Sequence, residues 1–108
     1  MGTVAYEIVA GLKRAGVDRM FGIPGGGPSA DLTSACAELG IEFVLTQHET
    51  SAVIMAGVYA LRKGTVGVAV SASGPGVANF TNGSAQAYLD RLPVIMFGDR
   101  QGESTHAI

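Results

Sequence analysis

Apolar residues recur at helical spacing near the start of the chain, and short apolar runs alternate with similar helical patterns beyond it. Val4, Ile8 and Leu12 would share one face of a helix for which Thr3 can serve as N-cap and Gly16 as the end. The same patterns predict helices at 3–15 and at about 29–38, 49–63 and 77–89, and strands at 19–23, 42–45, 66–70 and 93–98.

The predicted strand at 66–70 is a continuous apolar run rich in valine, which is typical of a strand buried on both faces of a parallel sheet. Helices and short strands alternate along the sequence, and right-handed crossovers then place helices on both sides. The sequence therefore predicts an α/β fold with an open parallel sheet and helices on both faces. With 108 residues there is room for one core, so we expect a single domain over residues 1–108.

Three turns lie where a predicted strand passes to a predicted helix, at 24–28, 47–49 and 73–76. In open parallel sheets, ligands bind outside the carboxyl ends of the strands. These turns share that edge, so we expect a functional site there.

Glu49 follows a predicted strand and opens a predicted helix, so its carboxylate would lie near free backbone amides and the positive helix end. Acids in the first helical turn are common for structural reasons alone. The next four residues, 50–53, are small or apolar and would let a flat ring approach closely. Two interpretations stay open here, an ordinary helix-start acid and a proton-sharing group of a site.

The glycine-rich turns allow either tight turn geometry or a close approach of the backbone to a ligand. Gly25, Gly27 and Ala30 satisfy the loose dinucleotide pattern G-x-G-x-x-A, which makes a dinucleotide-binding domain an alternative. Against it, Pro28 removes one amide donor, and the usual acid at the end of the following strand has no clean counterpart. A complete Walker A pattern does not occur.

The charge balance excludes one class of partner and indicates another. Seven basic and nine acidic residues give a net charge of −2, which supplies no cationic field for nucleic acid. Charged residues make up only 15% of the chain, against about 25% in soluble domains. This deficit indicates surface that another domain or subunit covers.

Cellular location is constrained by what the sequence lacks. No apolar stretch approaches the roughly 18 residues of a membrane helix, and the N-terminus has no secretory signal pattern. Cys36 is the single cysteine and is expected in the core, so no intrachain disulfide can form. We expect a cytoplasmic protein without membrane partners.

Four segments, in matching order and spacing, resemble successive signatures of the acetolactate synthase-like thiamine diphosphate enzymes. They read FGIPGG at Phe21–Gly26, QHETSA at Gln47–Ala52, SGPGVAN at Ser73–Asn79 and AYLDRLP at Ala87–Pro93. The resemblance, from about Thr3 to Asp99, is to the N-terminal aminopyrimidine-binding (PYR) domain. It implies the pyrimidine half-site of a 2-keto-acid decarboxylase or carboligase, with thiamine diphosphate as cofactor.

The resemblance also implies roles for single residues. In that family a glutamate at the position of Glu49 hydrogen-bonds the pyrimidine nitrogen N1′ and activates the cofactor, so Glu49 is the expected catalytic residue. Residues expected around the pyrimidine or the catalytic centre are Pro24, Gly25, Ser73, Gly74 and Asn79.

Two further residues, Gly26 and His48, are candidates for the substrate side, and a structural hydrogen bond is the alternative role for His48. Gln47 departs from the arginine that is usual at this position in acetolactate synthases. His106 lies in a terminal segment that looks like a substrate-channel or interface loop.

Family members bind the diphosphate and Mg²⁺ through a separate domain with a Gly-Asp-Gly motif. Here Gly98 and Asp99 are followed by Arg100, so we expect no metal ligands in this chain. Mg²⁺ would be held by a diphosphate-binding domain or subunit, and a homo-oligomer is expected. We further expect a truncated domain, as a fragment or small subunit. A non-catalytic dimerisation module of the same fold is the alternative.

Overall fold

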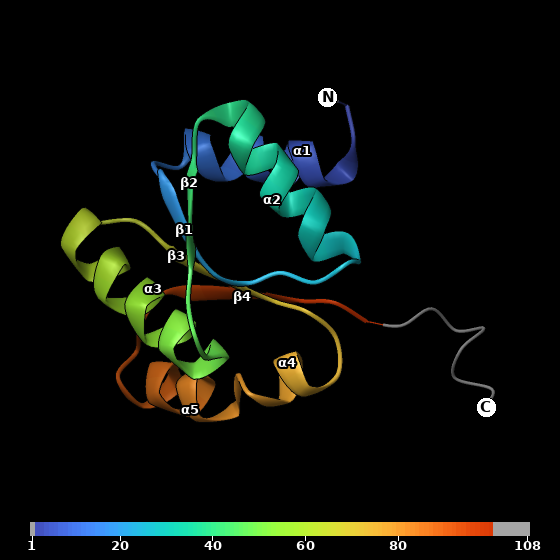
Figure 1. The fold of residues 1–108 in the computed structure, drawn as a ribbon. Helices are drawn as coiled ribbons and strands as arrows, with labels where there is room; N and C mark the ends of the chain where they lie inside the picture. Colours follow the sequence, from blue (N-terminus) through green and yellow to red (C-terminus); the bar gives the residue numbers. More distant parts are fainter. Residues whose placement is uncertain (1, 101–108) are drawn as a thin grey trace.

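The computed structural model describes residues 2–100 and contains a four-stranded parallel sheet between two layers of helices (Figure 1). The elements are α1 (Val4–Arg14), β1 (Arg19–Ile23), α2 (Pro28–Leu39), β2 (Glu42–Leu45), α3 (Glu49–Lys63), β3 (Gly67–Ser71), α4 (Pro75–Ala78), α5 (Thr81–Leu89) and β4 (Val94–Gly98). The strand order is β2-β1-β3-β4, and all neighbours are parallel. The predicted α/β class and open parallel sheet are confirmed.

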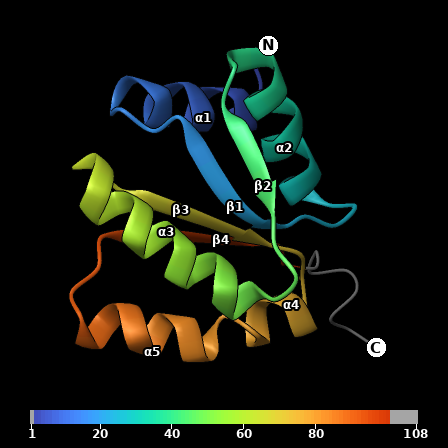
Figure 2. The same ribbon diagram turned by 60° about the vertical axis from the view of Figure 1, so that its left-hand side comes forward.

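The two faces of the sheet carry separate cores because side chains alternate along each strand. Met20 and Val70 pack with α1 and α2, whereas Phe21 and Ala69 pack with α3 and α5. Figure 2 shows α1 and α2 on one side of the sheet and α3, α4 and α5 on the other. The predicted placement of helices on both faces is therefore confirmed.

The inner strand β3 is buried at all five positions, as the valine-rich run predicts, although it begins one residue later. Its start lies against α3 so closely that a Cβ on Gly67 would stand 2.0 Å from the carbonyl oxygen of Ala56. Real Cβ atoms do not approach that distance, so only glycine lets this helix lie on this strand.

The expected single helix at 77–89 is wrong, because the structure divides that segment into α4 and α5 at Asn79 and Phe80. Two threonine hydroxyls donate to the carbonyls at the break. Thr81 Oγ1 bonds the Ala78 oxygen at 2.6 Å, and Thr50 Oγ1 bonds the Asn79 oxygen at 2.7 Å. Among the described residues no backbone amide donates to these two carbonyls, so the hydroxyls satisfy them where the helical ladder is interrupted.

Cys36 lies in the core, as expected, with its Sγ 3.4 Å from Met20 Sδ. Burial raises the pKa of the Cys36 thiol to about 11, which keeps it protonated and unreactive at neutral pH. His106 falls outside the described residues. Within residues 2–100, none of the helices has the length and apolar character needed to cross a membrane.

A polar cluster joins the C-terminal end of α3 to the start of β1. It lies at the amino ends of the strands, opposite the glycine-rich turns at their carboxyl ends. Asp18 Oδ1 accepts from the Tyr59 hydroxyl at 2.7 Å, and Oδ2 accepts from Lys63 Nζ at 2.9 Å. These hydrogen bonds, first from Lys63 and then from Tyr59, lower the pKa of Asp18. The same contact with Asp18 raises the pKa of Lys63.

We predict that Asp18→Asn lowers the thermal unfolding temperature at pH 7 and that the loss shrinks in acid. The folded-state pKa of Asp18 lies below its ordinary value of 3.8, so its stabilisation is present above that pH and disappears as the pH falls through the folded value. Thermal melts from pH 2 to 7 measure this. In a Lys63→Met background, Asp18→Asn should lower the unfolding temperature by less. An equal decrease would contradict an interaction between Asp18 and Lys63.

Candidate functional site

The start of α3 places Glu49 at the carboxyl edge of the sheet. His48 is the N-cap, and its ring Nδ1 accepts from the Thr50 amide at 3.0 Å. Glu49 then begins the helix, and only 8% of its surface is exposed. The ring of His48 thus has the structural role that was one of its two expected roles. A histidine cap was not foreseen because serine, threonine, aspartate and asparagine are the usual N-caps.

The Glu49 carboxylate lies between the side chain of Asn79 and the backbone of Gly76. Asn79 Nδ2 donates to Glu49 Oε1 at 3.1 Å. On the other side, a Cβ on Gly76 would stand 3.3 Å from Glu49 Oε2. The structure therefore brings together two predicted site residues that are 30 positions apart, and it shows why glycine suits position 76 at the start of α4.

The β1–α2 turn packs against the β3–α4 turn, so two of the predicted glycine-rich segments adjoin. A Cβ on Gly25 would lie 2.7 Å from the Cβ of Ala72. The Gly25 amide donates to Ser29 Oγ at 2.8 Å, and Ser29 in turn donates to Asp99 from its amide and its hydroxyl. Sequence reasoning missed Ser29 and treated Asp99 only as part of an absent Gly-Asp-Gly motif. An acid at the carboxyl end of a strand was the available signal.

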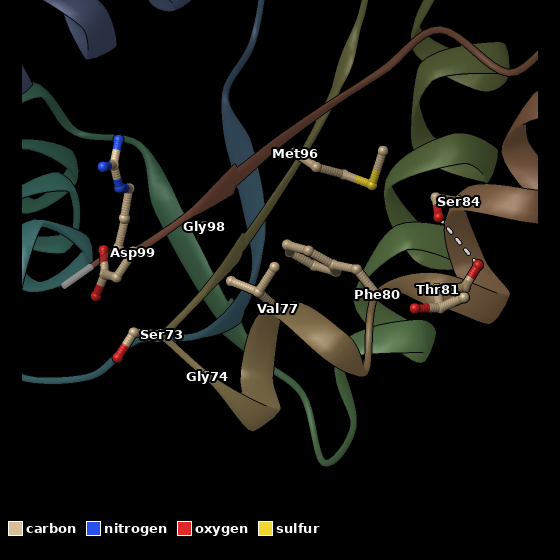
Figure 3. A pocket seen from close by; sticks show the side chains of 10 residues that line it. Ser73, Gly74, Val77, Phe80, Thr81, Ser84, Met96, Gly98 and Asp99 are labelled. Atoms are coloured by element: carbon tan, nitrogen blue, oxygen red, sulfur yellow. Dashed lines mark hydrogen bonds between the residues drawn. The ribbon is translucent and has the colours of Figure 1, made fainter. Parts of the chain in front are cut away.

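A cavity of about 860 Å³ opens beside the β3–α4 turn, between α4, α5 and β4. Ser73 and Gly74 lie at one end of it, and the side chains of Val77, Phe80 and Met96 meet in its middle (Figure 3). Thr81 and Ser84 line the other end. Glu49 is not among the lining residues, but its contacts Gly76 and Asn79 flank Val77, which is one.

No group of three or more histidine, cysteine, aspartate or glutamate side chains that could hold a metal ion occurs within residues 2–100. The nearest acids to the predicted site already have protein partners. Asp99 binds Ser29, and Glu49 binds Asn79.

The family comparison decides the class of the chain. Residues 2–106 match the family model described as "Thiamine pyrophosphate enzyme, N-terminal TPP binding domain". The chain belongs to this thiamine pyrophosphate enzyme family. Thiamine pyrophosphate is another name for thiamine diphosphate, so the predicted family and its cofactor are confirmed together.

Relatives of the chain in this family are acetolactate synthases. The chain is 41% identical over 96 residues to the acetolactate synthase of Arthrospira platensis, covering 86% of the chain and 17% of the relative. It is also 41% identical over 91 residues to the acetolactate synthase large subunit of Lactococcus lactis, with 84% and 16% covered. Isozyme 2 of Escherichia coli is 39% identical over 91 residues. The chain thus spans less than a fifth of each relative's length.

We predict that Asn79→Ala destabilises the fold by about 1 kcal/mol, because Glu49 Oε1 loses its amide donor in a mostly buried place. Urea denaturation at pH 7 measures the change. Asn82→Ala is the matched control, since Asn82 is exposed on α5 and makes no hydrogen bond through its side chain in the described structure. In a Glu49→Ala background, Asn79→Ala should leave the free energy of unfolding unchanged. The same decrease in both backgrounds would show that the hydrogen bond to Glu49 does not cause it.

Proposed function

We propose that the chain is the pyrimidine-binding part of a thiamine diphosphate-dependent enzyme that decarboxylates or joins 2-keto acids, as an acetolactate synthase does. The observation that carries this proposal is the Glu49 carboxylate, buried at the start of α3 and held by Asn79. A carboxyl group fixed in a nearly dry place is what hydrogen bonding to N1′ of the cofactor requires.

The second oxygen of Glu49 supports the fit. Within residues 2–100 no group donates a hydrogen bond to Oε2, although Asn79 donates to Oε1. Gly76 leaves the space near Oε2 without a side chain. A ring nitrogen could therefore share a proton with Oε2 while Asn79 fixes the orientation of the carboxyl group.

The remaining predicted residues take supporting roles in this proposal. The backbone lies close to the pyrimidine at Pro24, Gly25, Ser73 and Gly74. Gly26 and the exposed ring of His48 face the substrate, while Nδ1 of that ring caps α3. The bound cofactor supplies the electron sink for decarboxylation. The protein positions the ring and presents Glu49 Oε2 as the hydrogen-bonding partner of N1′.

Domain organisation and assembly belong to the same proposal. Residues 1–108 act as a single pyrimidine-binding domain, and a separate domain or subunit binds the diphosphate and Mg²⁺ through oxygen ligands. Copies of the chain associate through apolar side chains that α3 and α5 leave in solvent. Among these, Val58 is 54% exposed, Leu61 63% and Tyr88 84%. Such a surface favours burial against another subunit.

We predict that Glu49→Gln lowers kcat about 100-fold or more when the chain replaces the matching segment of the Lactococcus lactis relative. Glutamine keeps the size of the side chain but cannot share a proton with N1′. Pyruvate consumption with thiamine diphosphate and Mg²⁺ measures the effect.

The matched control for that experiment is Glu7→Gln, since Glu7 is also a first-turn acid but lies exposed on α1. It should leave kcat unchanged. If the replacement protein consumes pyruvate at the same rate with Glu49→Gln as with Glu49, the proposed role of Glu49 is wrong. A folded replacement protein that consumes no pyruvate would overturn the proposed activity.

We also predict that the chain sediments as a dimer or larger species at high micromolar concentration, and that Leu61→Glu shifts it toward the monomer. A charge placed in an apolar contact must be desolvated, which weakens association. Val4→Glu is the control, because Val4 is 78% exposed on α1, which covers the other face of the sheet. A chain that stays monomeric at all concentrations would refute self-association through this surface.

A further inference from the structure

A hydrogen-bonded relay runs from the end of β4 to the β1–α2 turn. Asp99 Oδ1 accepts from the Ser29 amide at 2.8 Å, and Oδ2 accepts from the Ser29 hydroxyl at 2.6 Å. The same hydroxyl oxygen accepts from the Gly25 amide at 2.8 Å. Ser29 is 1% exposed, so the relay passes through a buried centre.

This relay takes the place of the usual helix cap. The N-cap of α2 is Gly27, which has no side chain to bond the first turn, and Pro28 has no amide hydrogen. Asp99, which directly follows β4 and lies 70 positions further along the chain, supplies the missing acceptor. A negative carboxylate is also favourable at the positive end of a helix. Capping alone accounts for the bond to the Ser29 amide but not for the link to Gly25.

The link to Gly25 fixes the position of the turn that precedes α2. Gly25 lies against Ala72, and a Cβ on Gly27 would stand 3.1 Å from Asp99 Oδ2. The turn is thus held between β4 on one side and the β3–α4 turn on the other. Asp99 also lines the cavity that Ser73 and Gly74 reach.

We propose that Ser29 and Asp99 are positioning residues that hold the Pro24–Gly27 turn in place for the cofactor. This inference rests on the proposed function, since it assigns the turn to the pyrimidine site. Neither side chain needs to touch the cofactor. Asp99 orients Ser29, and Ser29 fixes the Gly25 amide, so the backbone of the turn is organised before the ring binds. Such preorganisation raises affinity by lowering the ordering cost of binding.

The test uses Ser29→Ala, Asp99→Asn and the double variant, with Ser34→Ala and Asp31→Asn as matched controls. Ser34 and Asp31 are exposed on α2 and make no side-chain hydrogen bonds in the part of the chain described. Amide hydrogen exchange of Gly25, followed by nuclear magnetic resonance on the chain without cofactor, reports on the turn itself. The dissociation constant of thiamine diphosphate and kcat at saturating cofactor are measured in the replacement protein described above.

We expect Ser29→Ala to speed Gly25 exchange and to raise the dissociation constant, each about tenfold, with kcat changed less than about twofold. The double variant should be no worse than Ser29→Ala, because both residues belong to one relay. The controls should change neither quantity. Asp99→Asn can still accept from the Ser29 amide, so it should change Gly25 exchange and the dissociation constant less. It replaces Ser29→Ala in the test if that variant fails to fold.

Four results would overturn the inference. Faster Gly25 exchange with an unchanged dissociation constant would show that the relay only stabilises the fold. Additive effects in the double variant would show that the two residues act separately. If the replacement protein with unchanged Ser29 and Asp99 does not bind thiamine diphosphate, the proposed function fails and the positioning role fails with it. Normal binding by all variants removes the positioning role alone.

Discussion

The close packing of α3 on its neighbours is the constraint on which the geometry of the candidate site depends. Three interfaces of this helix lack a side chain on one partner. A Cβ on Gly67 would lie 2.0 Å from the carbonyl oxygen of Ala56. One on Gly57 would lie 2.5 Å from Leu92 Cδ1, and one on Gly83 would lie 2.7 Å from Val53 Cβ. Interiors are close-packed, so atoms added at Gly67, which would meet backbone, or at Gly83, which would meet a stiff valine, would move the helix rather than fill a void. Any such movement would carry Glu49 away from its partners at the far end.

Polar contacts fix α3 at both of its ends. At the C-terminal end, Tyr59 and Lys63 bind Asp18, and at the N-terminal end Glu49 and Thr50 bind Asn79. The first set is exposed and lies far from the carboxyl edge of the sheet. Its contribution is to stability, whereas the second set determines where a carboxylate points. A helix that is fixed at both ends holds its first residue in one position. A site that must be organised before its ligand binds requires this.

The fold could be predicted from the sequence because its signals are local. The valine-rich run, the glycines after helices and the helical spacing of apolar residues each lie within one element. What could not be predicted depends on contacts between distant segments. At the break, the Asn79 carbonyl accepts from Thr50, and the first turn of α2 is capped by Asp99. The position of Glu49 follows from local pattern, but its contact with Asn79 required the fold.

The break between α4 and α5 and the orientation of Glu49 have a common origin. Asn79 contacts two consecutive residues of α3, because its amide group donates to Glu49 and its carbonyl accepts from Thr50. Across the described part of the chain, no backbone amide donates to the Asn79 oxygen, so Thr50 supplies the donor that the helical ladder lacks at this point. The side chain of the same residue holds Glu49. Asn79 therefore joins the break between α4 and α5 to the start of α3, and the two features are linked through one residue.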